Sequence, residues 1–252
     1  MTVNELYAKL NALIPTSLSC EWDNDGLMCC SDGAREVKKA LVCLDVTRDA
    51  VRKAIDENFD VIVSHHPFIF KGLKSVTENN FIPQKAIELI RAGISVMSFH
   101  TRLDAVSGGV NDTLASMLGL ENTEPFGEGI GRIGELDDAT DGVSFAKKVK
   151  ESLGAPAVFL ADSKKAIKRV AVLGGSGDDF ISEAIMLGAD AYVSGELGHH
   201  PMTDAPDMKI TLIEAGHFYT EQPVCEALCD MIKKIDSSVA CEIYNSNRTT
   251  VI

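Results

Sequence analysis

The sequence lacks an excess of basic residues, because 37 Asp and Glu outweigh 24 Lys and Arg and leave a net charge of −13. Nucleic acids and anionic membrane surfaces attract basic proteins, so neither is an expected partner, whereas cations are suitable ligands. Long hydrophobic runs are also lacking, since no apolar segment approaches the roughly 18 residues that a membrane span requires. These absences favour a globular protein that does not enter a membrane.

Paired cysteines are missing too. The seven cysteines are an odd number scattered over 252 residues, and the adjacent Cys29 and Cys30 are poorly placed to bond each other. No disulfide framework is predicted, and reduced thiols are expected. The first ten residues contain neither the basic nor the apolar segment of a secretory signal, so the expected location is the cytoplasm.

What the chain does contain is an alternation of short apolar segments with amphipathic ones. The apolar segments predict strands at 40–44, 61–63, 94–99, near 158, 170–173, 191–193, 210–213 and near 240. Helical spacing of apolar residues predicts helices at 3–14, 48–55, 83–92, 144–153, 179–187 and 221–235. Strands that alternate with helices favour an α/β fold with a largely parallel sheet. The regularity lapses in a glycine-rich stretch after residue 124.

The two halves of the chain repeat one pattern. The segment 59–64 (FDVIVS), which leads into His65-His66-Pro67, has a counterpart in 189–194 (ADAYVS), where His199-His200-Pro201 arrives a few residues later. In each half the next predicted strand ends in a histidine that is followed four residues later by a carboxylate. We interpret the pattern as an internal duplication, with α/β halves at 1–124 and 125–252. The alternative is chance similarity between short βα units.

All six histidines lie in these strand-end segments, at His65, His66, His100, His199, His200 and His217. Ligands of open α/β sheets bind beyond the carboxyl ends of the strands, where these side chains emerge. Adjacent residues of an extended segment point to opposite sides, so His65 and His66 are expected to serve two ions lying side by side. For any single histidine, the alternative is a polar strand end or a helix cap.

Carboxylates complete the pattern. His100 precedes Asp104 by four residues and His217 precedes Glu221 by four, so each pair shares one face if its segment is helical. Imidazole and carboxylate together suit zinc, iron or manganese better than magnesium or calcium, which prefer oxygen donors alone. The residues therefore predict a dinuclear transition-metal site, with Glu221 able to bridge the two ions.

Four segments resemble the signatures of the GTP cyclohydrolase I type 2 homologues, also called the Nif-three-like dinuclear metal-centre proteins. They are 64–70 (SHHPFIF), 100–105 (HTRLDA), 194–200 (SGELGHH) and 216–221 (GHFYTE). The resemblance, which covers essentially the whole chain, implies five metal ligands: His65, His66, Asp104, His217 and a bridging Glu221. It also implies one composite unit of two α/β halves with the metals in the cleft between them, assembled into a ring-shaped homohexamer. Some members carry an inserted mid-chain domain, for which 252 residues leave no room.

By this resemblance the protein is a metal-dependent hydrolase that opens the purine ring of GTP and yields formate and 7,8-dihydroneopterin triphosphate. His100 is the candidate proton donor and, with Glu221, the candidate catalytic pair. We place His100, His199, His200 and Glu196 around the ligands. Residues in such positions orient ligands, bind substrate or relay protons, and a structural polar role is the alternative for each. The competing hypothesis is a non-enzymatic protein of the same family that binds or delivers metal or acts as an adaptor.

Two glycine-rich segments are weaker signals. Gly129–Gly134 matches the dinucleotide pattern GxGxxG, but no buried strand precedes it and no helix follows, so turns flanking a short strand are predicted. Gly174–Gly177 lies between a predicted strand and a predicted helix, where backbone N–H groups could cradle a phosphate. Because Asp178 and Asp179 would repel an anion, tight-turn glycines are favoured over a substrate contact.

Overall fold

The computed structural model describes residues 1–252 and divides into two compact units. The first unit contains Met1–Leu103 and Val224–Arg248, and the second contains Asp104–Pro223 and Thr249–Ile252. Both are mixed α/β structures, each with its own sheet. The predicted α/β class with two similar halves is therefore confirmed.

The expected boundary at residue 124 is wrong. The chain enters the second unit at Asp104 and returns to the first at Val224. The returning segment forms α10 (Val224–Ile235) and β11 (Ala240–Tyr244), and β11 pairs in parallel with β2 (Lys39–Cys43) along its whole length. The last strand therefore completes the sheet of the first unit, a pairing that local sequence cannot reveal.

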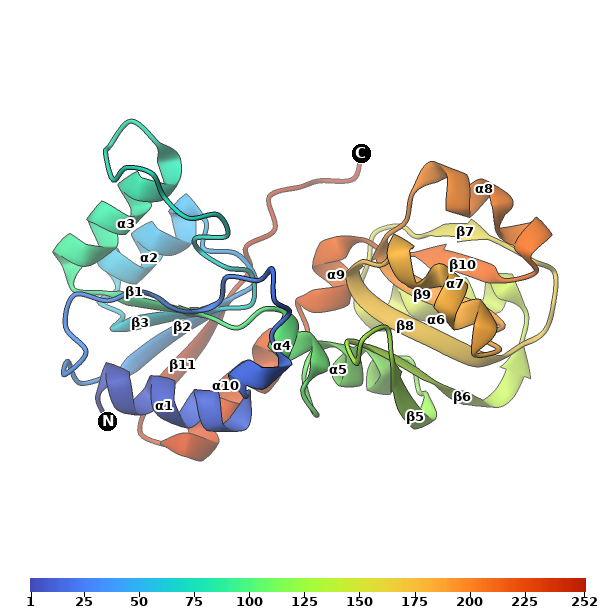
Figure 1. Ribbon diagram of the computed structural model, residues 1–252, viewed down its shortest axis with the longest axis horizontal. Coiled ribbons are helices and arrows are strands. Elements are labelled where there is room, and N and C mark those ends of the chain that lie inside the picture. Colours follow the sequence, from blue (N-terminus) through green and yellow to red (C-terminus); the bar gives the residue numbers. More distant parts are fainter. The chain divides into compact units, whose positions relative to one another are not determined.

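The first unit is built on a five-stranded sheet with the order β1-β4-β3-β2-β11. Its other strands are β1 (Gly26–Cys29), β3 (Val61–Ser64) and β4 (Ser95–Ser98), and only β1 runs antiparallel. Figure 1 shows α2 (Arg48–Asp56) and α3 (Phe81–Ala92) on one face, and α1 (Val3–Leu13) and α10 on the other. Because both faces are covered, β2 and β3 are nearly continuous apolar runs. A short 3-10 helix, η1 (Thr16–Leu18), follows α1.

The second unit is built on a six-stranded sheet with the order β5-β6-β8-β9-β10-β7. Its strands are β5 (Glu121–Phe126), β6 (Gly131–Thr140), β7 (Phe159–Ala161), β8 (Ile167–Ser176), β9 (Ala191–Glu196) and β10 (Thr211–Glu214). The central β8, β9 and β10 are parallel, but the other three strands pair antiparallel, so the prediction of a largely parallel sheet holds only for the centre.

Helices cover both faces of this second sheet. They are α5 (Val110–Met117), α6 (Gly142–Leu153), α7 (Ile181–Met186) and α8 (His199–Met208), with the 3-10 helix η2 (Asp178–Phe180) before α7. One apolar cluster joins residues of α5 and α6 to the sheet, and a second joins residues of α7 and α8 to it. The sheet is therefore a buried middle layer, and its strand ends are the places where polar side chains emerge.

Two parts of the second unit differ from the sequence prediction. The stretch after residue 124 is a hairpin of β5 and β6, which lacks an apolar signal because five of the six β5 residues are exposed. Its turn holds the start of the GxGxxG segment, so the dinucleotide reading is rejected as expected. Helix α8 was not predicted, because Pro201 and Pro206 lie within it and interrupt the usual helical pattern.

The internal repeat is visible in hydrogen bonds as well as in element order. The series β2-α2-β3-α3-β4 of the first unit matches β8-α7-β9-α8-β10 of the second. Asp60 and Asp190, which the sequence comparison aligns, make the same contacts. A carboxylate oxygen of Asp60 accepts from the N–H groups of residues 38 and 39 at 2.8 and 3.0 Å, and one of Asp190 accepts from residues 168 and 169 at 3.0 and 2.9 Å. Shared geometry of this kind favours duplication over chance similarity.

The histidine motifs of the two units have similar sequences but different structural positions. His65 and His66 directly follow β3, whereas His199 and His200 begin a helix. The N–H of Phe99 donates to the Ser64 carbonyl, and the N–H of Ala215 donates to the Ser194 carbonyl, so Phe99 and Ala215 are equivalent positions. His100 directly follows Phe99, whereas His217 lies two residues after Ala215. The extra residue is Gly216, which has a φ of 86°.

Two predictions of absence can be compared with the structure. No helix of the protein is both long enough and apolar enough to cross a bilayer. The structure contains no disulfide bond among the seven cysteines.

Candidate metal centre

Three histidines of the first unit gather where two parallel strands end. β3 and β4 are neighbours, with Ser64 paired to Ser98, so the segments that follow them leave the same edge of the sheet. One ring nitrogen from each of His65, His66 and His100 lies within 4.8 Å of the others. His65 is fully buried, and the other two rings are partly exposed. Sheet topology therefore brings His100 to His65 and His66, which precede it by 35 and 34 positions in the chain.

The expectation that His65 and His66 point to opposite sides is wrong. Their ring centroids lie 5.0 Å apart, and the two residues form a bend after β3 rather than part of the strand. The alternation rule applies only to extended backbone, so it does not hold at this position. Ring nitrogen atoms that lie within 4.8 Å of one another suit either one ion or two neighbouring ions roughly 3.5–4 Å apart.

Every ring of this group is held through its Nδ1 atom. His65 Nδ1 lies 3.0 Å from the Phe99 carbonyl oxygen, and because a carbonyl only accepts, Nδ1 must carry the proton. His66 Nδ1 donates to Asp45 Oδ1 at 2.8 Å. His100 Nδ1 donates in the same way to Asp23 Oδ1 at 2.9 Å. In a neutral ring of this tautomer Nε2 carries the lone pair, which is the form that binds a metal.

Asp23 is a buried acceptor for the loop that carries His100. Its side chain is fully buried, and it also accepts from the N–H and Oγ1 of Thr101 at 3.0 and 2.7 Å. Burial by itself would raise the pKa of Asp23, but the hydrogen bonds from His100 and Thr101 outweigh it and lower the pKa to about 2. Asp23 is therefore an ionised carboxylate at neutral pH.

A buried arginine, Arg102, fixes the backbone at His100 through Asp25. Arg102 is fully buried, and its Nε donates to Asp25 Oδ2 at 2.8 Å while Nη1 donates to the Ile14 carbonyl at 3.0 Å. Asp25 Oδ2 in turn accepts the backbone N–H of His100 at 3.3 Å. These charge-assisted bonds fix the position from which the His100 ring projects.

The second unit has a group of its own, made of one histidine and two buried carboxylates. α9 (His217–Glu221) starts three residues after β10, and the i,i+4 spacing places His217 Nε2 3.0 Å from Glu221 Oε2, as expected for one helical face. Asp104 lies in α4 (Thr101–Ala105), and one of its carboxylate oxygens is within 4.8 Å of one of Glu221. Asp104 and Glu221 are only 7% and 4% exposed. His217 Nδ1 donates to Glu196 Oε1 at 3.0 Å, so Glu196 orients this ring.

The glycines of the Gly174–Gly177 segment make room for α9. A Cβ on Gly175 would lie 2.3 Å from Glu221 Oε1, and Gly175 also has a φ of +71°. The N–H groups of Gly174 and Gly175 donate to Asn111 Oδ1 and Thr220 Oγ1 at 2.8 and 3.2 Å. These two donors are therefore used by the protein itself, which removes the basis for a phosphate cradle. The favoured interpretation as turn glycines also changes, because both lie within β8.

His199 and His200 are not part of either group. Both are exposed at the start of α8, with ring centroids 5.5 Å apart.

Asp23 and Asp45, by contrast, were not found from the sequence. Asp45 follows β2 closely, as His65 and His66 follow β3, so the rule on parallel strand ends could have indicated it. Asp23 lies in an irregular loop, and no sequence signal connects it with His100.

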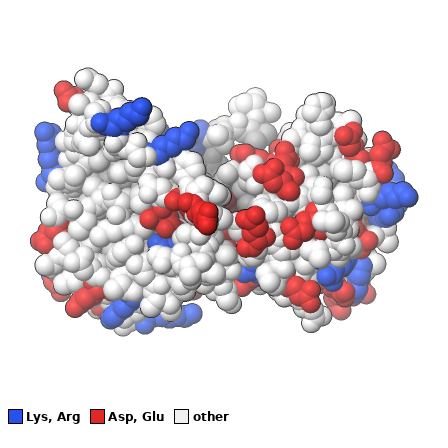
Figure 2. All heavy atoms as spheres, in the orientation of Figure 1, with Lys and Arg blue, Asp and Glu red and all other residues white.

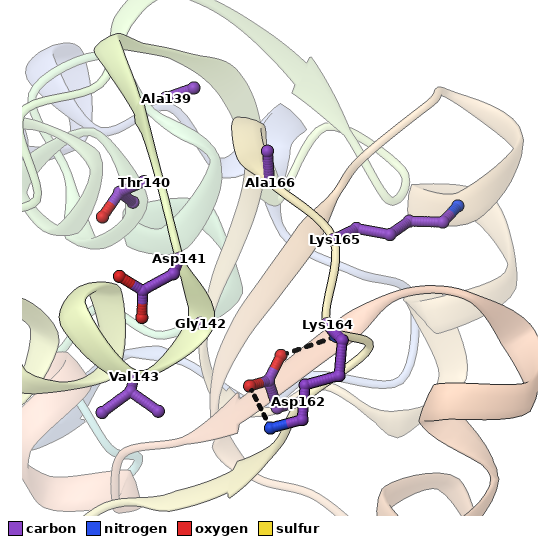
Figure 3. Close-up of a pocket in the computed structure, with 9 residues that line it drawn as sticks. All are labelled: Ala139, Thr140, Asp141, Gly142, Val143, Asp162, Lys164, Lys165 and Ala166. Atoms are coloured by element: carbon purple, nitrogen blue, oxygen red, sulfur yellow. Dashed lines mark hydrogen bonds and ion pairs between the residues drawn. The ribbon is translucent and has the colours of Figure 1, made fainter.

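The surface also has a cavity of about 610 Å³ in the second unit, shown in Figure 3. It lies where α6 begins, and none of the predicted metal ligands line it. Three of its four charged side chains are engaged within the protein, since Lys164 pairs with Asp162 at 2.9 Å and Asp141 caps α6 through Ser144; the fourth is Lys165. Figure 2 shows many separate acidic groups on the face it displays, in keeping with the net charge of −13.

Comparison with known proteins gives consistent results. The model of the family described as Duf34/NIF3 (NGG1p interacting factor 3) matches residues 1–250. A relative named GTP cyclohydrolase 1 type 2 homolog from Clostridium perfringens is 32% identical over 248 residues, which are 95% of this chain and 94% of the relative. One of the same name from Clostridium acetobutylicum is 33% identical, with coverage of 95% and 91%. A solved structure of a hypothetical protein from Staphylococcus aureus has a TM-score of 0.92 at 28% identity and covers 100% of this chain and 99% of its own.

Proposed function

The chain belongs to the Duf34/NIF3 family, and from this premise we propose that it is a hydrolase that uses two transition-metal ions, zinc, iron or manganese. The proposed ligands are His65, His66, Asp104, His217 and Glu221, with Glu221 bridging. The proposed reaction takes GTP and water to formate and 7,8-dihydroneopterin triphosphate. The resemblance of four sequence segments and the names of the relatives support this choice of reaction.

One observation carries the metal proposal: four histidine rings are oriented in the same way, by a hydrogen bond at Nδ1. In His65, His66, His100 and His217, Nδ1 is bonded to a carbonyl or carboxylate oxygen, which directs Nε2 away from that partner. Metal-binding histidines in proteins characteristically donate their other N–H to such a partner. All three histidines of the proposed ligand set are arranged in this way, which favours metal binding over a set of unrelated polar contacts.

The distances in the second unit support the same conclusion. Two ligand atoms that are each about 2.1 Å from one ion lie roughly 3–3.4 Å apart. His217 Nε2 and Glu221 Oε2 are 3.0 Å apart, which fits two ligands of one ion. Two carboxylates as close as Asp104 and Glu221 repel each other when both are ionised, and a bound cation relieves that repulsion.

Two ions held by the five proposed ligands would supply an activated water at neutral pH and would stabilise negative charge. His100 handles the proton. Its Nδ1–H is held by the ionised Asp23, which stabilises a positive charge on the ring and leaves Nε2 to deliver or receive a proton. The oxygen atoms that accept hydrogen bonds from Nδ1 of His65, His66 and His217 keep these three rings in fixed orientations.

Elemental analysis of the purified protein tests the metal proposal. We expect about two transition-metal ions per chain, as a dinuclear site requires. Glu221→Ala should lose at least one of them, whereas Glu226→Ala, which removes an exposed carboxylate on α10, should retain both. A Glu221→Ala protein with both ions would show that the proposed bridge is wrong. His100→Gln should keep both ions, and loss of an ion would make His100 a ligand instead of the proton donor.

Turnover is tested separately with the metal-loaded protein. Incubation with GTP should release formate and a fluorescent pterin in equal amounts. If full metal occupancy gives no turnover of GTP or of phosphoesters, the hydrolase proposal fails and the metal-binding or metal-delivery function becomes the better account.

The proposed assembly is a homohexameric ring, which rests on the family resemblance. Light scattering should give a mass about six times the 27.1 kDa of one chain. A monomeric or dimeric mass at working concentration would rule the ring out.

A further inference from the structure

Two large aromatic side chains are exposed beside the histidine group of the first unit. Trp22 is 62% exposed and Phe70 is 45% exposed. Both rings lie 6.1 Å from the ring of His100, measured between centroids, and 6.2 Å from each other. Tryptophan is usually a highly buried residue, so an exposed one next to a candidate reaction centre is informative.

The three rings form a corner. The planes of Trp22 and Phe70 meet at 74°, and those of His100 meet them at 77° and 88°. Edge-to-face contacts of this kind stabilise the rings against one another. Because Trp22 and Phe70 keep 62% and 45% of their surface exposed, both side chains remain accessible to a ligand. Trp22, Phe70 and His100 are called the aromatic corner below.

Polar contacts of neighbouring residues hold the aromatic corner. Asp23, next to Trp22, is bonded to His100 and Thr101. Asn24 Nδ2 donates to the carbonyl oxygen of Ile69, which precedes Phe70. The segments that carry the two exposed rings are thus tied to each other and to the histidine loop, so the aromatic corner is preorganised rather than assembled on binding.

We propose that the aromatic corner binds a planar heteroaromatic base, of the purine or pterin class, which stacks on the face of Trp22 and meets the Phe70 ring edge-to-face. The proposal rests on the proposed function and names the part of the substrate that this region recognises. A base is uncharged, so its stacking is not opposed by the net charge of −13, which would repel a free polyphosphate. A stacked base would lie beside His100, the residue to which proton transfer is assigned.

The single tryptophan makes this proposal directly measurable, because all indole fluorescence comes from Trp22. Guanosine, which carries no phosphate, is titrated into the wild-type protein with excitation at the red edge of the indole band. We expect saturable quenching, with no change for ribose 5-phosphate at equal concentration. Free N-acetyltryptophanamide corrects for absorption by the nucleoside. Absence of saturable quenching would overturn the proposal.

Calorimetry then measures the contribution of each ring. Stacking on an aromatic side chain is worth roughly 5- to 150-fold in affinity, so Trp22→Leu should weaken guanosine binding within that range. Phe70→Leu should weaken it as well, and Trp22→Phe should restore part of the loss. Phe81→Leu is the matched control, because Phe81 is also exposed but lies on α3 and is in no ring contact with His100. Equal affinities of Trp22→Leu and Phe81→Leu would contradict the proposal.

The failure of this proposal and that of the proposed function give different results. If guanosine binding depends on Trp22 but the protein turns over no substrate, the aromatic-corner proposal is supported and the hydrolase proposal is refuted. If Trp22→Leu turns over GTP with an unchanged KM, the hydrolase proposal is supported and the aromatic-corner proposal is refuted. Light scattering covers the remaining use of an exposed aromatic surface: a lower mass for Trp22→Leu than for Phe81→Leu would show a contact between copies of the chain and overturn the proposal.

Discussion

Asp45→Asn tests whether ring orientation, and not only ligand identity, sets metal affinity. In the folded protein Asp45 Oδ1 accepts the Nδ1–H of His66 at 2.8 Å. Asn also offers an oxygen to that N–H, so the substitution keeps the hydrogen bond and removes the negative charge. The backbone N–H of Asp45 donates to Ser246 Oγ at 3.1 Å in either case, which keeps the segment in place.

The expected magnitude follows from the exposure of Asp45. Loss of such a partner of a metal-bound histidine weakens metal binding by roughly 10- to 100-fold, or about 1.4–2.7 kcal/mol. The Asp45 side chain is 48% exposed, so water screens its charge and we expect a loss near the lower limit, about tenfold. Asp45→Ala removes the hydrogen bond too and should lose more.

The assay is competition for zinc against a chromophoric chelator, which gives the dissociation constant directly. Asp49→Asn is the control, because Asp49 is a similarly exposed carboxylate that pairs with Arg52 and Arg248 and contacts no histidine of the group. Equal affinity of Asp45→Asn and wild type would refute the inferred role of the Nδ1 partner. An equal loss in Asp49→Asn would refute it as well, since the effect would then come from net charge alone.

Three further predictions test the packing around the site and the stability of the units. Gly175→Ala should lose bound metal, since the new Cβ would lie 2.3 Å from a carboxylate oxygen of the proposed bridge, whereas Gly154→Ala, also at positive φ but in open space, should keep it by elemental analysis. In Asp60 burial alone would raise the pKa, but hydrogen bonds lower it, so its stabilisation is present above the unfolded pKa of about 3.9 and is lost as pH falls through the folded value. Asp60→Asn should therefore reduce the free energy of unfolding by about 1.5–3 kcal/mol at pH 7, and denaturation at lower pH should show that difference shrinking. Cys229 and Cys241 have Sγ atoms 2.7 Å apart, so oxidised glutathione should take up two electrons and two protons and lower the thiol count from seven by two, a change that Cys229→Ser prevents.

The parts of the fold that the sequence predicts well are those in which the local pattern and tertiary burial agree. The predicted helix at 3–14 is present as α1, and a capping box begins it, with Glu5 N–H donating to Thr2 Oγ1 and Thr2 N–H donating to Glu5. The apolar runs at 61–63 and 191–193 are central parallel strands, because a sheet covered on both faces requires continuous apolar sequence. Where that agreement fails, as in the exposed strand β5 and the proline-containing helix α8, the prediction fails too.

The amino-acid sequence is sufficient to identify the chemical groups of the candidate site and their local spacing. The i,i+4 distance between His217 and Glu221 is a property of one helical turn, so it follows from the residue numbers once the segment is helical. The hydrogen-bond partner of each histidine ring, in contrast, depends on tertiary contacts. Asp23 lies 77 residues from His100 and Asp45 lies 21 residues from His66, and their contacts exist because strand order and loop packing bring these segments together. Sequence periodicity records which side of an element is buried, but it carries no record of which distant segment lies against it.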